Sequence, residues 1–227
     1  MRILLLLALV ASLGGEHRAY AQTANPYEMV TCSLETRGTN TQGQPIVFRL
    51  ILDNRSLQPV TVNLGYDREG AFRFKIKRPD GSLIAPPQKQ VREGISRVGE
   101  FRIPAGERYS QQIIVDEWYK FIAPGSYVVS LTMPESICSE MALPVDITPP
   151  DAEELSKFSL ELANAVRENK KNYEKASEAA TVLARIENPL VVPFLMKAVE
   201  ANTMVDSILI PALERIGDNA AIRSLIT

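Results

Sequence analysis

Histidine is almost absent from this sequence, which contains a single imidazole at His17. That residue lies in an N-terminal segment that we expect to be removed on export. Nothing would then remain to accept a proton from a serine or cysteine nucleophile near neutral pH, which excludes Ser-His and Cys-His catalytic sites. Histidine-based zinc, copper and non-haem iron sites are excluded for the same reason. Walker loops, dinucleotide-binding glycine motifs and EF-hand ligand strings are also missing. The sequence therefore predicts no cofactor, no metal ion and no catalytic residue.

Catalysis by two carboxylates would need no imidazole. The segment Asp116-Glu117, next to Trp118 and Tyr119, is the one place that suggests such a pair. Adjacent side chains of a strand point to opposite faces, so these two acids could not share a site on a strand. We expect them to lie at a solvated strand end, and a carboxylate-pair hydrolase is the function that we favour least.

Cysteine is scarce as well, with Cys32 and Cys138 as the only pair. In an oxidising compartment an even number of cysteines favours a disulfide. Closing a loop of about a hundred residues would contribute on the order of 4 kcal/mol in the chain-entropy model. The alternative is two buried free thiols.

Neither sign of charge dominates: 25 Lys and Arg face 27 Asp and Glu, a net charge of −2. Loss of Arg2, Arg18 and Glu16 with the N-terminal segment would change this to −3. Such a mild acidic balance gives no electrostatic basis for binding nucleic acid. It also provides no polybasic signal for anionic membranes.

Residues 1–21 have the order of a secretory signal peptide. Arg2 supplies the positive charge, Ile3 to Leu13 form an apolar run, and Ala19-Tyr20-Ala21 gives the small-x-small cleavage pattern. The run is too short to cross a bilayer of about 30 Å as a helix, although an uncleaved membrane anchor is the alternative. We expect cleavage after Ala21 and a protein of the bacterial periplasm or secreted medium, not inserted in the membrane.

Residues 22–148 have the pattern of an all-β domain. Short alternating apolar segments, such as 59–64 and 71–77, recur between turns such as Pro79-Asp80-Gly81. Seven or eight strands at this spacing predict a β-sandwich.

Two segments of this half resemble immunoglobulin-like and fibronectin type III-like domains. Ile103 to Glu107 is similar to the turn before a penultimate strand, and Ala123 to Val129 looks like a tyrosine corner, in which the Tyr127 hydroxyl would hydrogen-bond the upstream backbone. The position two residues after Tyr127 is not cysteine, so Cys32 and Cys138 would instead tie the first strand to the start of the last. The resemblance implies an architecture and no particular activity.

Two loops and an aromatic cluster are the candidate binding elements of the sandwich. Long loops on rigid sandwiches often carry binding function, which draws attention to residues 65–70 and 86–97. Clustered Trp and Tyr suit an interface or a sugar platform. They suit the core equally well, and we expect them there. The candidate partner-binding residues are Tyr66, Arg68, Arg92, Arg97, Trp118 and Tyr119.

Pro149-Pro150 separates the sandwich from an all-α segment, residues 151–227. Asp151 is the expected N-cap of its first helix, with Glu154 three residues on as in a capping box. Apolar side chains at a period of 3.6 predict four amphipathic helices, none of which would be stable alone. They fall near residues 155–166, 173–186, 189–198 and 204–213.

An internal repeat relates these helices: Leu183, Arg185, Ile186 and Leu195 recur thirty residues later as Leu213, Arg215, Ile216 and Leu225. The pattern resembles short HEAT-like repeats, also seen in phycobilisome-lyase-type proteins, and Pro211 would supply their familiar kink. An ordinary bundle of helical hairpins is the alternative. No lyase motif is present, whereas HEAT-like stacks mainly bind proteins. The apolar face that starts at Ile222 lacks a polar capping helix. We therefore expect either that this edge docks on a partner, for example a second copy of the chain, or that the natural chain continues beyond Thr227.

Taken together, these patterns predict a multidomain protein: an all-β immunoglobulin-like sandwich plus an all-α HEAT-like segment. We expect an exported, non-enzymatic scaffold that binds protein partners through the helical face, the sandwich loops or both. The alternative is a sandwich module that binds one defined ligand, either protease-inhibitor-like or carbohydrate-binding.

Overall fold

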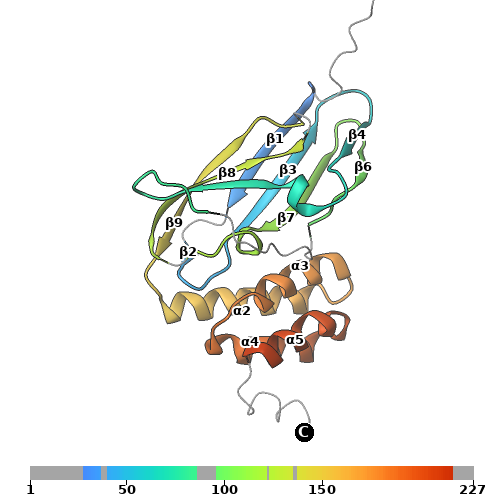
Figure 1. Cartoon of the computed structure of the whole chain (residues 1–227). Coiled ribbons are helices and arrows are strands. Elements are labelled where there is room, and N and C mark those ends of the chain that lie inside the picture. Colours follow the sequence, from blue (N-terminus) through green and yellow to red (C-terminus); the bar gives the residue numbers. More distant parts are fainter. Residues whose placement is uncertain (1–27, 37–39, 86–95, 122, 135–136, 217–227) are drawn as a thin grey trace, which may run out of the picture.

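The computed structural model describes residues 28–36, 40–85, 96–121, 123–134 and 137–216. The expected signal peptide, Arg92 and the apolar face that starts at Ile222 lie outside the described residues. Figure 1 shows the strands gathered in one part of the molecule and the larger helices stacked at one end of it.

The strands form two main sheets and a short ribbon. One sheet has the order β1-β3-β7, the other β2-β9-β8-β5, and β4 pairs with β6. Every pairing is antiparallel except that of β2 with β9. The strands are β1 (Val30–Thr36), β2 (Asn40–Thr41), β3 (Val47–Asn54), β4 (Val60–Asn63), β5 (Arg73–Lys77), β6 (Glu100–Ile103), β7 (Arg108–Ile114), β8 (Gly125–Thr132) and β9 (Met141–Thr148).

The alternation of side chains explains why these strands pack as a β-sandwich. In β5, Phe74 and Ile76 are buried while the three basic residues between and beside them are exposed. Side chains of a strand point to opposite faces, so the apolar set of each sheet enters one shared core. Phe48 of β3 and Phe74 of β5 meet there, with ring centroids 6.5 Å apart.

A disulfide and a hydrogen bond stabilise the sandwich. Cys32 of β1 is bonded to Cys138, which precedes β9, so the predicted disulfide is confirmed and joins the two sheets. The Tyr127 hydroxyl donates a hydrogen bond to the Ala123 carbonyl oxygen at 2.8 Å, the contact of a tyrosine corner.

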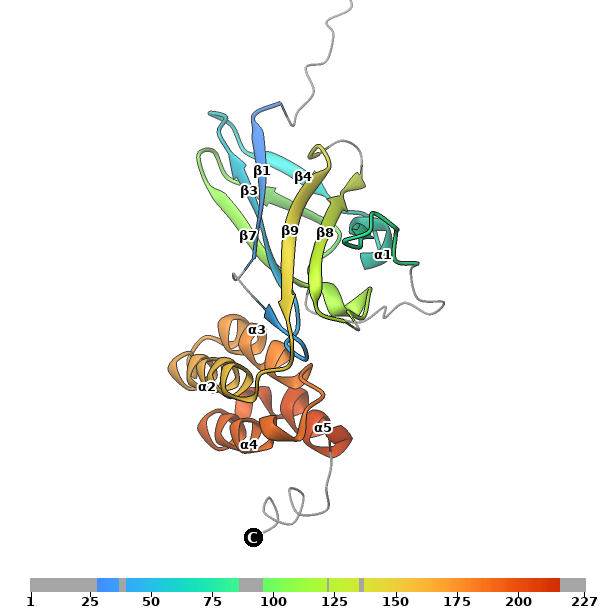
Figure 2. The same cartoon turned by 90° about the vertical axis from the view of Figure 1, so that its left-hand side faces the viewer.

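Within the described residues, four α-helices follow the last strand and form two layers. The hairpin of α2 and α3 lies against the sandwich, and α4 and α5 lie beyond it (Figure 2). Asp151 caps α2 by accepting hydrogen bonds from the backbone of Glu153 and Glu154. The elements are α2 (Ala152–Glu168), α3 (Tyr173–Ala184), η3 (Pro189–Val191), α4 (Val192–Ala201), η4 (Thr203–Val205) and α5 (Asp206–Ile216).

The sandwich and the helices share an apolar contact. Ile114, at the end of β7, is completely buried and belongs to the helical core, and Val47 of β3 packs against the same cluster. Gln112 adds a polar contact, because its side chain donates to the carbonyl oxygen of Glu178 in α3 at 3.4 Å. Two short helical elements interrupt the strands of the sandwich half: α1 (Arg68–Ala71) between β4 and β5, and η1 (Val115–Glu117) after β7.

Candidate functional site

The predicted partner-binding residues do not form one surface. Tyr66 is fully exposed, and Arg97 is also exposed, with its guanidinium carbon 5.6 Å from the centroid of the Phe101 ring. Trp118 and Tyr119 are buried in the sandwich core, where the Tyr119 hydroxyl donates to the Phe74 carbonyl oxygen. These two aromatic residues therefore lie in the core, where we expected them, and offer almost no surface to a partner.

The structure contradicts the prediction for Arg68. It was expected to contact a partner from a loop, but only 5% of the residue is exposed. The Asp67 side chain caps the short helix α1 by accepting from the Gly70 amide, and this turn directs Arg68 inward. Its guanidinium carbon lies 4.6 Å from the centroid of the Trp118 ring.

The expectation of a solvated strand end at Asp116 and Glu117 is also wrong. β7 ends at Ile114, and the chain enters the tight turn η1, in which the Trp118 amide bonds the Val115 carbonyl oxygen. Glu117 is buried there. The turn faces the helices, and a contact with this distant part of the chain helps to bury Glu117, while Asp116 remains half-buried.

Glu117 is the centre of a buried ion-pair triad, which we call the Arg–Glu–Arg triad. One carboxylate oxygen accepts from Arg68, and the other accepts from Arg185 of the helical half at 3.0 Å. The Glu117 side chain has no exposed surface, whereas the Arg185 side chain keeps 34%. Moving charges out of water costs several kcal/mol per ion, so the two buried charges, those of Arg68 and Glu117, depend on each other.

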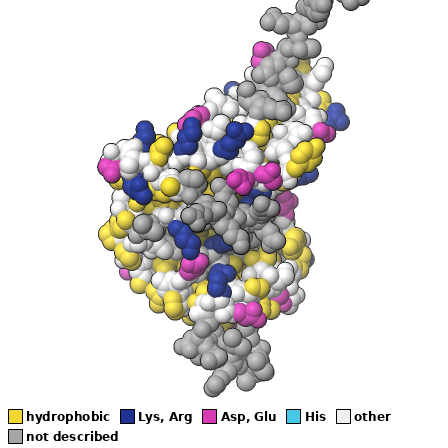
Figure 3. Space-filling view, in the orientation of Figure 1, with side chains coloured by type: hydrophobic (Ala, Val, Ile, Leu, Met, Phe, Trp, Pro, Cys, Tyr) yellow, Lys and Arg dark blue, Asp and Glu magenta, His cyan; other side chains and the backbone are white. Residues whose placement is uncertain are grey.

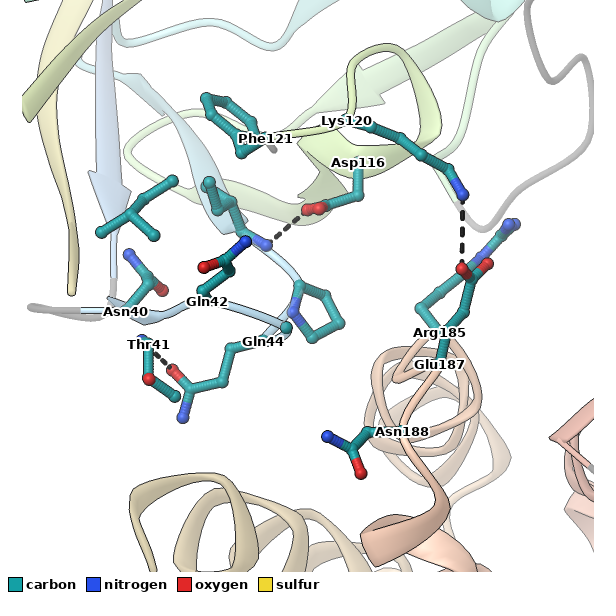
Figure 4. Close-up of a pocket in the computed structure, with 14 residues that line it drawn as sticks. Asn40, Thr41, Gln42, Gln44, Asp116, Lys120, Phe121, Arg185, Glu187 and Asn188 are labelled. Carbon is teal, nitrogen blue, oxygen red and sulfur yellow. Dashed lines mark hydrogen bonds and ion pairs between the residues drawn. The ribbon is translucent and has the colours of Figure 1, made fainter. Parts of the chain in front are cut away.

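A cleft of about 430 Å³ lies beside the triad (Figure 4). The side chains of Gln42 and Gln44, between β2 and β3, form one wall. Arg185 and Glu187, at the end of α3, form the other wall, and Lys120 reaches over from the segment after η1. The cleft therefore lies between the sandwich and the helices, a common location for binding sites.

Asp116 lines this cleft, and its pKa is shifted toward neutral pH. The residue keeps some surface, but protein atoms largely enclose its carboxyl group, which accepts a hydrogen bond from the Ile46 amide. Burial raises the pKa of Asp116 to about 7, with a smaller contribution from the Glu117 charge. The Ile46 amide, its own amide and Lys120 act in the opposite direction on this pKa. Asp116 therefore changes charge near neutral pH.

Lys120 and Glu187 form an ion pair across the mouth of the cleft. The Lys120 Nζ lies 3.3 Å from a carboxylate oxygen of Glu187, and the two side chains are 74% and 63% exposed. Exposed pairs of this kind contribute about 0–1 kcal/mol. The pair is therefore weak enough to open.

A second hollow, of about 360 Å³, lies between strands β3 and β7 and helices α2 and α3. Phe158 and Leu162 line its helical side, while Arg49 and Gln112 line the sheet side. Burial raises the pKa of Glu178 at its edge, and Arg49 opposes that change. The helices contribute apolar side chains such as Phe158 and Leu162 to this hollow, whereas they contribute the charged Arg185 and Glu187 to the cleft beside the triad.

Sequence reasoning did not identify the triad or the cleft. One signal was present: Arg185 and Arg215 occupy the same position of the internal repeat. In the structure both side chains bond to the part of the molecule that comes before them in the sequence. Arg185 donates to Glu117 of the sandwich, and Arg215 donates to the carbonyl oxygen of Ala184 in the first hairpin. Among the described residues, no helix is long and apolar enough to cross a membrane. Within the same residues no group of three His, Cys, Asp or Glu side chains could hold a metal ion.

No family model matches the chain, and no curated protein matches it either. Several solved structures resemble part of it, among them a β-glucosidase, a CARDB domain and a PapD-like domain. A β-glucosidase from Listeria innocua is 10% identical with a TM-score of 0.30, over 53% of this chain and 16% of that one. A CARDB domain from Pyrococcus furiosus, in complex with di-metal ions, is 7% identical with a TM-score of 0.29, over 53% of this chain and 90% of that one. A PapD-like domain of human CEP192 is 12% identical with a TM-score of 0.25, over 66% and 97%.

The chain thus spans about a sixth of the length of the β-glucosidase. At TM-scores this low, none of the three similarities supports an argument about function. The assignment of a β-sandwich rests on the sheet order and the shared core.

Proposed function

We propose that this chain is an exported, non-enzymatic scaffold for protein interactions, in which an immunoglobulin-like sandwich carries a short HEAT-like stack as its binding element. One observation carries the proposal: the helical layers are fixed to the end of the sandwich by the buried Arg–Glu–Arg triad and by Ile114. A rigid support lowers the entropy lost when a partner binds.

The arrangement of the helices supports a repeat rather than an unrelated bundle. α4 contacts α2, and α5 contacts α3, so the second hairpin lies on the first in the same order. The two repeat arginines act alike: Arg185 reaches up to Glu117 of the sandwich, and Arg215 reaches up to Ala184 of the first hairpin. Each layer is therefore tied to the preceding one from the same repeat position.

The helical half offers exposed apolar side chains for a partner. Leu190, Met204 and Ile210 are between 37% and 45% exposed. On the face shown in Figure 3, basic and acidic side chains are interspersed, and hydrophobic ones are scattered over the helical half. Such a mixed surface favours a protein partner over nucleic acid, which would require a continuous basic patch.

Site-specific photo-crosslinking in the exporting cell tests whether the exposed apolar side chains of the helical half contact a protein. A crosslinking residue at position 210, on α5, is compared with one at position 57, on the loop at the far end of β3 from the helices. Leu57 is 98% exposed, so it is the matched apolar control. We expect a discrete protein adduct from position 210 that Met204→Glu abolishes. Equal labelling from both positions, or a substrate turned over by the purified chain, would overturn the proposal.

Export is tested separately. Cell fractionation and N-terminal sequencing should find the chain outside the cytoplasm, beginning at Gln22. An unprocessed chain that remains in the cytoplasm contradicts this part of the proposal and leaves the helical contact to be judged by crosslinking.

A further inference from the structure

We propose that the cleft beside the Arg–Glu–Arg triad binds the carboxylate group of a small polar ligand, held by Lys120 and Arg185. The site lies between the sandwich and the end of α3 (Figure 4). It is separate from the exposed apolar side chains proposed to contact proteins, and either site could exist without the other.

The charges around the cleft leave an excess of positive charge. Two arginines, Arg68 and Arg185, share the single carboxylate of Glu117, so the triad carries one uncompensated positive charge. Lys120 and Glu187 cancel each other. Asp116 could neutralise the excess, but burial works against its ionisation. An anion that enters the cleft would supply the missing charge.

Glu187 shows how a carboxylate is held at this place. Its carboxylate lies 3.3 Å from Lys120 Nζ, and Glu187 lines the same wall of the cleft as Arg185 (Figure 4). Both members of the pair are largely exposed, so a ligand carboxylate can displace Glu187 at little cost. Glu187 is thus an internal competitor of the ligand.

The opposite wall of the cleft indicates which other chemical groups the ligand carries besides its carboxylate. It bears no charged side chain. Gln42 lines the cleft beside the apolar Ile46, whereas the amide of Gln44 turns toward Thr41 (Figure 4). Gln44 is held in place because its side-chain oxygen accepts from the Thr41 amide at 3.1 Å. Amide side chains both donate and accept hydrogen bonds, which suits hydroxyl or amide groups. The ligand class is therefore a small hydroxylated or amide-bearing carboxylic acid, of a size that fits a cleft of about 430 Å³.

Titration of the purified chain followed by NMR tests this proposal with two matched pairs of probes. One pair is D-glucuronate and D-glucose, and the other is an acetylated dialanine with a free carboxylate and its carboxamide. We expect only the acids to shift the resonances of residues around the cleft. The acid that binds more tightly shows whether the source is a saccharide acid or a peptide end. Binding of the neutral analogues with equal affinity, or no shift at the highest soluble concentration of either acid, overturns the proposal.

Three variants connect the binding to the named groups. Lys120→Gln should abolish it, whereas Glu187→Gln should tighten it up to about fivefold by removing the internal competitor. The control is Glu140→Gln, which breaks a similarly exposed pair with Lys75 on the sandwich and should change nothing. A carboxylate that binds Lys120→Gln as tightly as the unaltered chain, or a Glu187→Gln variant that binds more weakly, contradicts the assignment.

The pH dependence gives an independent readout. Asp116 is faced by Glu117 on its own turn, by Lys120, and by Arg185 and Glu187 across the cleft. When it ionises near pH 7, the excess positive charge disappears, so the affinity for the acids should fall as the pH rises through that value. Asp116→Asn should remove the fall. An unchanged pH profile in this variant is inconsistent with the charge balance proposed here.

Discussion

Replacement of Glu117 by Gln should destabilise the folded chain more than any other single change at the junction. The substitution keeps the size of the side chain but removes the only negative charge of the Arg–Glu–Arg triad. Arg68, which is 5% exposed, would then remain charged and buried without a counter-ion. Removing one partner of a buried pair costs about 3–5 kcal/mol, and we expect a loss of that order in the free energy of unfolding.

The single tryptophan makes this loss measurable. Trp118 is buried, and its ring lies 4.6 Å from the Arg68 guanidinium carbon, so its fluorescence reports directly on the triad. Urea unfolding of the unaltered chain and of Glu117→Gln gives the difference in free energy. Arg185→Gln is the control: it leaves the Arg68–Glu117 pair intact and removes a partly exposed partner, so it should cost about 1 kcal/mol or less.

A double variant separates the charge from the packing. Arg68→Met with Glu117→Leu removes both buried charges, and apolar replacements of buried pairs are often neutral or stabilising. It should recover most of the stability that Glu117→Gln loses. The reasoning fails if Glu117→Gln costs less than about 1 kcal/mol, if Arg185→Gln costs as much, or if the double variant is no more stable than the single one.

Three further changes test other parts of the structure. Replacing Cys32 and Cys138 together by Ser opens a link across 106 residues and should lower the free energy of unfolding by about 4 kcal/mol in urea titrations. Tyr127→Phe removes the hydroxyl that donates to Ala123 and should cost about 0.5–1.5 kcal/mol in the same assay. Asp116 has a folded-state pKa of about 7 against an ordinary value of 3.8, so its contribution to stability is complete below pH 3.8 and is lost as the pH rises through 7. Asp116→Asn should remove that loss, as measured by unfolding at a series of pH values.

The sandwich could be predicted because its information is local. The alternation around Phe74 and Ile76 determines which face of β5 is buried whatever else the chain does. The tyrosine corner is similarly local, since Tyr127 bonds a carbonyl oxygen only four residues before it. The two cysteines could be paired because the chain contains no other cysteine.

The junction could not be predicted because its contacts are distant. Glu117 meets Arg68 and Arg185, which lie 49 and 68 residues away in the sequence. In the β half of the sequence, Asp116 and Glu117 have the pattern of a polar strand end, whereas in the structure Glu117 is buried against Arg68 and bonded to Arg185. A polar residue that is buried by another part of the chain has no signature in its own neighbourhood. The cleft, which both halves line, was invisible for the same reason.

The two repeat arginines suggest why a sandwich precedes the helices at all. Stacked helical hairpins leave an apolar face open at each end and need a cap. Ile114 and Val47 of the sandwich pack on the helical core, and in the HEAT-like stack that we propose they take the place of a preceding hairpin. Arg185 binds Glu117 of the sandwich as Arg215 binds the first hairpin, so the sandwich takes the part of the layer before. Because this contact is partly ionic, the cap is matched to its stack by charge as well as by shape, and the cleft exists only when the two are joined.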